Sequence, residues 1–142
     1  MTIKSPIINI MTKAAYKAGN KLIKDFREVE NLQVSKKGVG DFVSTADFNS
    51  EETIINELQK FYPNIDIISE EANPNISDNK NEKKFLVDPL DGTLNFLHGL
   101  PHFSISIALM YKEEIISGIV YDPIKDEMFW AEKGIGAFLN NS

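Results

Sequence analysis

The chain has 142 residues, a net charge of −6 at pH 7 and no cysteine, and 42% of its residues are hydrophobic. This is ordinary for one globular domain with a real core, and it excludes a disulfide framework and a thiolate zinc site. The acidic balance argues against general affinity for nucleic acid or for an anionic membrane. With no apolar run of membrane-spanning length and no signal-peptide pattern, we expect a cytoplasmic protein without a membrane partner.

The first segment, Pro6 to Val29, carries apolar residues at helical spacing, with its lysines mostly off that stripe. Ser5 followed by Pro6 is typical of a helix start, a cap and then a first-turn proline. A basic amphipathic helix can lie on a membrane, but an alanine-rich stripe favours a core position. We therefore predict a long core-facing helix. Its expected stripe is Ile7, Ile10, Met11, Ala14, Ala15, Ala18, Leu22, Ile23 and Phe26.

The next stretch, Leu32 to Val43, contains two glycines and is predicted as a loop or loose hairpin. A second amphipathic helix follows, with Asp47 as its expected N-cap and Pro63 beyond its end. The position of Asp47 alone favours the capping role over a chemical one.

A short buried strand is predicted from Ile65 to Ser69, with Glu70 and Glu71 directly after it. Successive side chains of a strand face opposite ways, so at most one of these glutamates can serve a common site. A polar loop, Ala72 to Lys83, then precedes a second short strand, 84–87.

Two carboxylates, Asp88 and Asp91, follow that strand in a stretch rich in turn residues. They can point into one small volume if the chain reverses at Pro89-Leu90. Two carboxylates about 4 Å apart repel by roughly 4 kcal/mol at an effective dielectric of 20, so an ionised pair held together needs a cation. Oxygen ligands without cysteine favour Mg²⁺ or Mn²⁺. Gly92 permits close approach of the backbone, and a short helix over Thr93 to Leu97 offers free N–H groups to a phosphate. The stretch indicates metal-assisted phosphoryl transfer, although its six residues from Asp88 also fit a plain surface turn.

The remaining sequence predicts strands over Phe103–Tyr111, Ile115–Tyr121, Met128–Glu132 and Ala137–Leu139, separated by turns. Strands at this spacing form an antiparallel meander. The predicted class is therefore α+β, with two long helices packed on one face of a mainly antiparallel sheet.

The two histidines do not form a metal pair by this pattern. His98 and His102 stand at i,i+4, but Pro101 interrupts a continuous helix face. A hydrogen-bonding or packing role is expected for both.

The stretch from Asp88 onward resembles the signature of the inositol monophosphatase family. It reads Asp88-Pro89-Leu90-Asp91-Gly92-Thr93-Leu94-Asn95-Phe96, then His98, Pro101 and Ser104-Ile105-Ser106-Ile107-Ala108. Three further segments fit the family layout in order, namely Asp41 to Asp47, Ser69-Glu70-Glu71, and Gly134 to Phe138. The resemblance implies a Mg²⁺-dependent, lithium-sensitive phosphomonoesterase, with inositol monophosphate as the leading substrate. It also implies the N-terminal half of the layered αβαβα sugar-phosphatase fold.

The resemblance implies a set of metal ligands made of oxygens. Glu70 and Asp91 each bind a metal, Asp88 bridges two metals, and the carbonyl of Leu90 is a further ligand. Glu70 is also counted among the catalytic residues. The implied cofactor is two or three Mg²⁺ ions, with Mn²⁺ as a substitute.

The resemblance also assigns the phosphate and the attacking water. The N–H groups of Gly92 and Thr93 would hold the substrate phosphate, while the Thr93 hydroxyl and Asp47 resemble the pair that orients the water. The resemblance also places a lysine near the site. This lysine is Lys36, or Lys37 if the two sequences are aligned one residue further on. No covalent nucleophile is needed, because metal ions acidify the water and neutralise the leaving alkoxide.

The family pattern continues beyond the length of this sequence. The resemblance implies that residues 1–142 are an N-terminal metal- and phosphate-binding domain, and that a second domain with a Trp-Asp segment completing the second metal site is absent. We therefore expect weak or no turnover from these residues alone. A homodimer is also expected, since family members are commonly dimers. The alternative is a non-catalytic half-domain, or an extragenic-suppressor-like regulator that acts through protein contacts, for example on transcription machinery.

Overall fold

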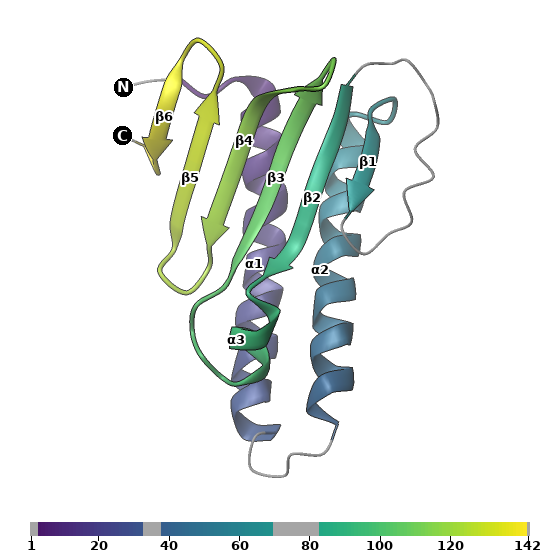
Figure 1. Ribbon diagram of the computed structural model, residues 1–142, viewed down its shortest axis with the longest axis vertical. Helices are drawn as coiled ribbons and strands as arrows, with labels where there is room; N and C mark the ends of the chain where they lie inside the picture. Colours follow the sequence, from purple (N-terminus) through teal and green to yellow (C-terminus); the bar gives the residue numbers. More distant parts are fainter. Residues whose placement is uncertain (1–2, 33–37, 70–82, 142) are drawn as a thin grey trace.

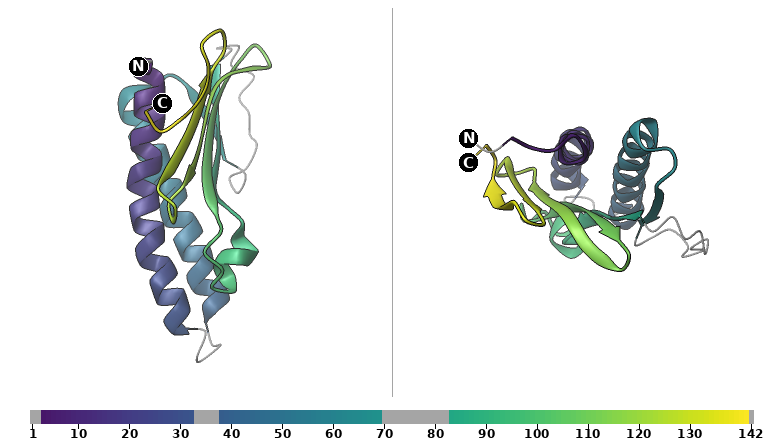
Figure 2. Two further views of the ribbon diagram at one scale, coloured as in Figure 1. Left: turned by 90° about the vertical axis from the view of Figure 1, so that its left-hand side faces the viewer. Right: turned by 90° about the horizontal axis from the view of Figure 1, so that it is seen from above.

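The computed structural model describes residues 3–32, 38–69 and 83–141, which fold as two layers (Figures 1 and 2). Two long helices form one layer and a six-stranded sheet forms the other. This confirms the predicted α+β class. Within the described ranges, no helix is long and apolar enough to cross a lipid bilayer.

Helix α1 (Pro6–Leu32) matches the predicted first helix and continues past Val29. The carbonyl of Ser5 accepts a hydrogen bond from the Asn9 N–H at 3.0 Å, which starts the helix where expected. Most of the predicted stripe is buried, but Ile7, Ile10 and Ile23 are only half-buried. The fully buried positions also include Ile8, which the predicted stripe omitted.

Helix α2 (Val39–Phe61) begins well before the predicted start, so two predictions are wrong. Asp47 lies inside the helix instead of capping it, and residues 39–43 are helical instead of forming a loop or hairpin. The helix begins after Gly38, whose φ of 81° is in the left-handed region. Val39 and Val43 are buried one helical turn apart, and this packing outweighs the low helix propensity of the glycine that lies between them.

The sheet order follows the sequence order, from β1 to β6. Its strands are β1 (Asp66–Ser69), β2 (Lys83–Asp91), β3 (Ser104–Tyr111), β4 (Glu114–Asp122), β5 (Glu127–Glu132) and β6 (Gly136–Leu139). The pair β1–β2 is parallel and all later pairs are antiparallel, which confirms the predicted meander. The short helix α3 (Thr93–Leu97) connects β2 to β3, also as predicted.

The core lies between the helix layer and the sheet (Figure 2). Helix α1 packs on β3 and β4, and α2 packs on β2. Alternate residues of the strands face the helices, as in β3, where Ile105, Ile107 and Leu109 are buried. Each such side chain contributes about 1.5–3 kcal/mol by its removal from water.

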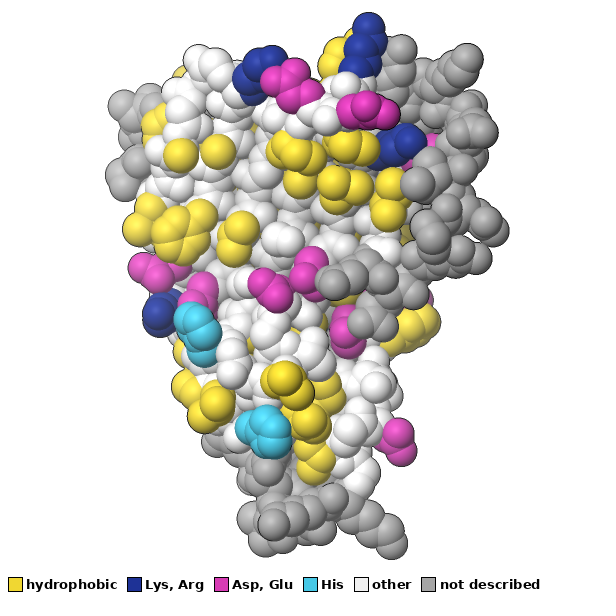
Figure 3. Space-filling view, viewed as in Figure 1, with side chains coloured by type: hydrophobic (Ala, Val, Ile, Leu, Met, Phe, Trp, Pro, Cys, Tyr) yellow, Lys and Arg dark blue, Asp and Glu magenta, His cyan; other side chains and the backbone are white. Residues whose placement is uncertain are grey.

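The opposite side of the sheet, which we call the open face, is not covered by any described helix (Figures 1 and 2). A shallow hollow of about 670 Å³ lies over β3 to β6, and its lining includes Ile116, Val120 and Phe129. Figure 3 shows hydrophobic side chains over the upper part of this face and acidic side chains across its middle. An apolar hollow on an uncovered sheet face is a candidate contact surface.

Candidate active site

The predicted carboxylates lie at a β-bulge, not at a chain reversal. Strand β2 continues through Asp91, and its pairing with β3 passes from Asp88–Ser106 to Asp91–Ser104, so β2 has one extra residue there. Proline has no N–H to give to a ladder and suits such a position. The bulge leaves Asp88 half-buried, buries Leu90 and exposes Asp91.

The bulge is held by hydrogen bonds among the motif residues themselves. The Leu90 N–H donates to Asp88 Oδ1 at 3.3 Å, and the Thr93 hydroxyl donates to the Leu90 carbonyl at 3.1 Å. A carbonyl oxygen has two lone pairs, and one of those of Leu90 accepts the Thr93 hydroxyl. The backbone of Leu90 thus connects the side chains of Asp88 and Thr93.

Gly92 is required by the backbone at the end of β2. Its φ is +89°, and a Cβ at this position would lie 3.0 Å from the His102 carbonyl oxygen and 3.3 Å from Phe103 Cα. The Gly92 carbonyl accepts the first helical hydrogen bond of α3, from the Phe96 N–H at 3.0 Å. Only glycine combines this conformation with this close approach.

Three aromatic rings fix the segment from α3 to β3 against α1. The ring centroids of Phe26 and Phe96 are 5.5 Å apart, those of Phe26 and Phe103 are 5.2 Å apart, and those of Phe96 and Phe103 are 4.9 Å apart. Such aromatic contacts add to the free energy of burial. Phe96 lies three residues after Thr93, so these contacts fix the short helix that begins at Thr93.

Helix α2 brings Asp47 to the same place. A pocket of about 440 Å³ is lined by residues of α2 and by the first residue of α3, namely Val43, Ser44, Asp47, Phe48, Glu51 and Thr93. Asp47 is buried, with 8% of its surface exposed, whereas Thr93 is exposed. The predicted pair of Asp47 and Thr93 is therefore brought together, although Asp88 and Asp91 do not line this pocket.

Two neighbouring residues of α2 tie the helix to the ends of the strands. The Ser50 hydroxyl is buried and donates to the Pro89 carbonyl at 2.7 Å, and Glu51 Oε2 accepts from the Ser69 hydroxyl at 2.7 Å. Neither Ser50 nor Glu51 is among the predicted site residues. The sequence could have indicated them only by their positions three and four residues after Asp47, which place all three residues on one face of a helix.

Other predicted site residues lie apart from this pocket or outside the residues that the structure describes. Glu70 and Lys36 are outside the described residues. In the part of the chain that is described, no three His, Asp or Glu side chains gather as a metal site. His98 and His102 are exposed, and it is the His102 backbone carbonyl that accepts a hydrogen bond, from Asn95 Nδ2 at 2.9 Å.

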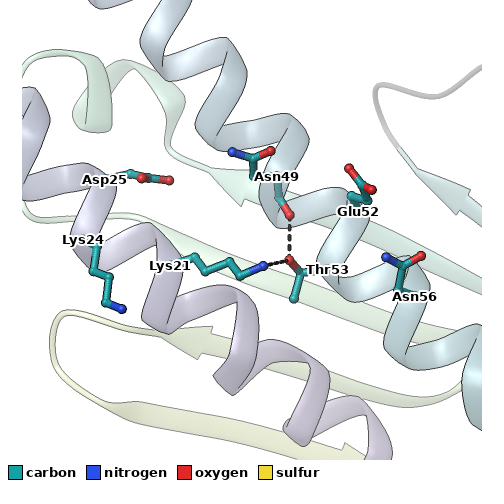
Figure 4. Close-up of a pocket in the computed structure, with 7 residues that line it drawn as sticks. All are labelled: Lys21, Lys24, Asp25, Asn49, Glu52, Thr53 and Asn56. Carbon is teal, nitrogen blue, oxygen red and sulfur yellow. Dashed lines mark hydrogen bonds between the residues drawn. The ribbon is translucent and has the colours of Figure 1, made fainter.

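A second, polar pocket of about 430 Å³ lies between α1 and α2 (Figure 4). Lys21 Nζ donates to Thr53 Oγ1 at 3.0 Å across it, and the Thr53 hydroxyl donates to the Asn49 carbonyl at 2.8 Å. Burial raises the pKa of Asp25 in its wall, Lys21 opposes this, and Glu28 adds to it. None of these residues belongs to the predicted motifs, and the pocket is separate from Asp47 and Thr93.

The chain belongs to the inositol monophosphatase family, whose model matches residues 3–142. It is 48% identical over 138 residues to an inositol-1-monophosphatase of Rhizobium meliloti, covering 97% of this chain and 52% of that protein. It is 43% identical over 136 residues to the Nus factor SuhB of Haemophilus influenzae, covering 96% of this chain and 51% of that protein.

Solved structures give the same result for the fold. The extragenic suppressor protein suhB of Bartonella henselae matches with a TM-score of 0.83 at 50% identity, over 96% of this chain and 53% of that one. An IMPase of Thermotoga maritima matches with a TM-score of 0.80 at 34% identity, over 97% and 52% of the two chains. The chain thus spans about half the length of these relatives.

Proposed function

We propose that this chain forms the metal- and phosphate-binding half of a Mg²⁺-dependent phosphomonoesterase, with inositol monophosphate as its leading substrate. The observation that carries the proposal is the shared pocket of Asp47 and Thr93, next to the bulge that contains Asp88 and Asp91. Family membership and the name of the Rhizobium meliloti relative support the same reaction. On this proposal residues 1–142 form one domain, and a second half of the protein supplies the remaining metal ligand and most contacts to the substrate's alcohol portion.

The donor atoms fit a hard divalent cation. Asp88, Asp91 and the Leu90 carbonyl offer only oxygens, and the Leu90 carbonyl oxygen has two lone pairs, one of which accepts the hydrogen bond from the Thr93 hydroxyl. With Glu70, these residues would hold two or three Mg²⁺ ions, or Mn²⁺ in their place. When bound, the metal supplies an acidified water and neutralises negative charge on the leaving oxygen.

The side chains of the pocket would orient the water. The Thr93 hydroxyl donates its proton to the Leu90 carbonyl, so its oxygen can accept a hydrogen bond from a water. The buried carboxylate of Asp47 can accept the second hydrogen of that water. Glu70 would also take part in catalysis on this proposal. The N–H groups of Gly92 and Thr93, which lie at the start of the first turn of α3 and have no carbonyl partner within that helix, would bind the phosphate oxygens.

The test is phosphate release from inositol 1-phosphate by the purified chain, titrated with Mg²⁺ and repeated with Li⁺. We expect weak turnover that requires Mg²⁺, falls with Li⁺ and disappears in Asp88→Asn. Glu113→Gln, an exposed acid in the turn between β3 and β4, is the matched control and should leave the rate unchanged. A folded chain that neither releases phosphate nor binds Mg²⁺ in calorimetry would contradict the proposal.

The second candidate function of this chain is contact with another protein. The open face presents an apolar hollow of about 670 Å³, and relatives named Nus factor SuhB match this chain at 41–43% identity. On this alternative the chain is a non-catalytic module or regulator, and the open face is its contact surface. Partner binding that survives Asp88→Asn but is lost in Val120→Glu would favour it.

The same face offers a route to the expected homodimer. Sedimentation of the purified chain as a dimer, with Val120→Glu as a monomer, would support dimerisation through the open face. A monomer at all concentrations would contradict it.

A further inference from the structure

A hydrogen bond connects the pocket wall to the end of strand β1. Glu51 Oε2 accepts it from the Ser69 hydroxyl at 2.7 Å. Ser69 is the last residue of β1 and is almost fully buried, with 2% of its surface exposed. Glu51 is half-buried and lines the pocket with Asp47 and Thr93.

Glu51 lies one helical turn after Asp47, so the two residues share one face of α2. A bond that fixes Glu51 to β1 therefore fixes the turn of helix that carries Asp47. The next strand is fixed in the same way, because Ser50 donates to the Pro89 carbonyl at the bulge of β2. Strands β1 and β2 are parallel, with Ser69 opposite Val87.

The hydrogen bond to Glu51 also explains how the Ser69 hydroxyl can be buried at the end of β1. A buried hydroxyl without a partner costs about 1–3 kcal/mol, and the Glu51 carboxylate supplies that partner. Glu52, the next residue of α2, is exposed and makes no such contact to β1 among the described residues.

We propose that Glu51 is a positioning residue, which through Ser69 sets the distance between Asp47 on α2 and the point where the chain leaves β1. This inference rests on the proposed function, because Glu70, the assigned metal ligand, directly follows Ser69 in the sequence. Glu51 itself does not contact the metal or the substrate in this role. Its effect passes through the hydrogen bond and not through its charge.

Two conservative variants separate the hydrogen bond from the charge. Glu51→Gln keeps an oxygen at the same reach but loses the charge, whereas Glu51→Asp keeps the charge but is too short to reach Ser69. We expect Glu51→Gln to bind Mg²⁺ within about twofold of the original chain, and Glu51→Asp and Ser69→Ala to bind it about tenfold more weakly, as for residues that orient metal ligands. The double variant Glu51→Asp/Ser69→Ala should be no worse than either single variant, because both remove the same bond.

Mg²⁺ affinity is measured by calorimetry on the whole 142-residue chain, with phosphate release as a second readout. In that second assay kcat should fall in Glu51→Asp while KM changes less. Glu52→Gln is the matched control and should behave like the original chain in both assays. Circular dichroism establishes that each variant is folded before it is compared.

The outcomes distinguish the inference from the proposed function. If Glu51→Gln loses as much Mg²⁺ affinity as Glu51→Asp, or if Glu51→Asp loses none, the positioning role is wrong while the proposed function stands. If the effects of Glu51→Asp and Ser69→Ala add, the two residues act independently and the inference again fails. A folded original chain that binds no Mg²⁺ and releases no phosphate would overturn both.

Discussion

Gly19 of α1 lies directly against the ring of Tyr121 in β4. A Cβ at residue 19 would lie 2.6 Å from Tyr121 Cε2 and 3.2 Å from Pro123 Cβ. The ring is held in place by a hydrogen bond from its hydroxyl to Asp126 at 2.8 Å and by an edge contact with Tyr16, at 4.8 Å between centroids. Gly19 is thus the point where the helix layer approaches the sheet most closely among the described glycines.

Gly19→Ala should therefore be less stable than Gly40→Ala by about 1–3 kcal/mol, the usual cost of overpacking, because alanine favours the helix at both positions. The measurement is the free energy of unfolding in urea. Gly40→Ala in α2 is the control, because nothing lies within 4 Å of a Cβ there, and it should be neutral or stabilising by up to about 1 kcal/mol. Equal stabilities for the two variants would show that α1 can shift away from Tyr121 at no cost.

Gly92→Ala should lower stability more than Gly134→Ala. Both glycines have positive φ, 89° and 81°, so both substitutions carry the left-handed penalty of about 1–2 kcal/mol. Only at Gly92 does the added Cβ also meet backbone atoms, at 3.0 and 3.3 Å, while Gly134 has open space around it. The difference between the free energies of unfolding of the two variants in urea gives the steric contribution at Gly92. A difference near zero would mean that the loop after Pro101 moves away freely.

Ser50→Ala should reduce stability by about 1–3 kcal/mol, since it removes the buried donor to the Pro89 carbonyl. Ser44→Ala, on the same helix but exposed, should have an effect within about 0.5 kcal/mol. Thermal unfolding of both variants provides the comparison. If Ser50→Ala is as stable as Ser44→Ala, the anchor between α2 and the bulge contributes nothing measurable.

Glu57 should make stability depend on pH. The hydrogen bond from Lys17, 2.8 Å long, lowers the pKa of Glu57; burial opposes this, and the charges of Lys17 and Lys13 add to the lowering. A carboxyl whose folded pKa is below its unfolded value of about 4.3 stabilises the protein above that value, and the contribution is lost as the pH falls through the folded pKa.

Glu57→Gln should therefore cost about 1 kcal/mol at pH 7, because the lysines that it pairs with are half-exposed, and less as the pH falls below about 4. Urea unfolding at several pH values gives this difference. Glu52→Gln, an exposed glutamate on the same helix, should show a smaller difference at pH 7. A constant effect of Glu57→Gln at all pH values would contradict the ion-pair explanation.

Local patterns in the sequence were sufficient for most of the elements. The alternation after Pro101 and the helical stripe after Pro6 predicted β3 to β6 and α1, because both depend on neighbours within a few residues. The start of α2 could not be found in this way. Gly38 and Gly40 indicate a loop, and only the packing of Val39 and Val43 in the core reverses that preference.

The geometry of the candidate site was only partly predictable from the sequence. The turn chemistry of residues 88–93 located the motif, but a bulge and a reversal use the same residues, and only the pairing with β3 distinguishes them. Asp47 was assigned as a cap from local spacing, and its place beside Thr93 depends on a contact between distant segments. The same holds for Glu51 and Ser69, whose hydrogen bond no local pattern contains.

The described sheet ends on both sides in a strand of four residues, β1 and β6. A strand this short presents few unpaired N–H and C=O groups to an incoming chain, and short edge strands are a common protection against fibre-like polymerisation. Growth of the sheet by strand addition is therefore disfavoured at either margin. Assembly of copies through the open face would use side-chain contacts, which do not extend the sheet.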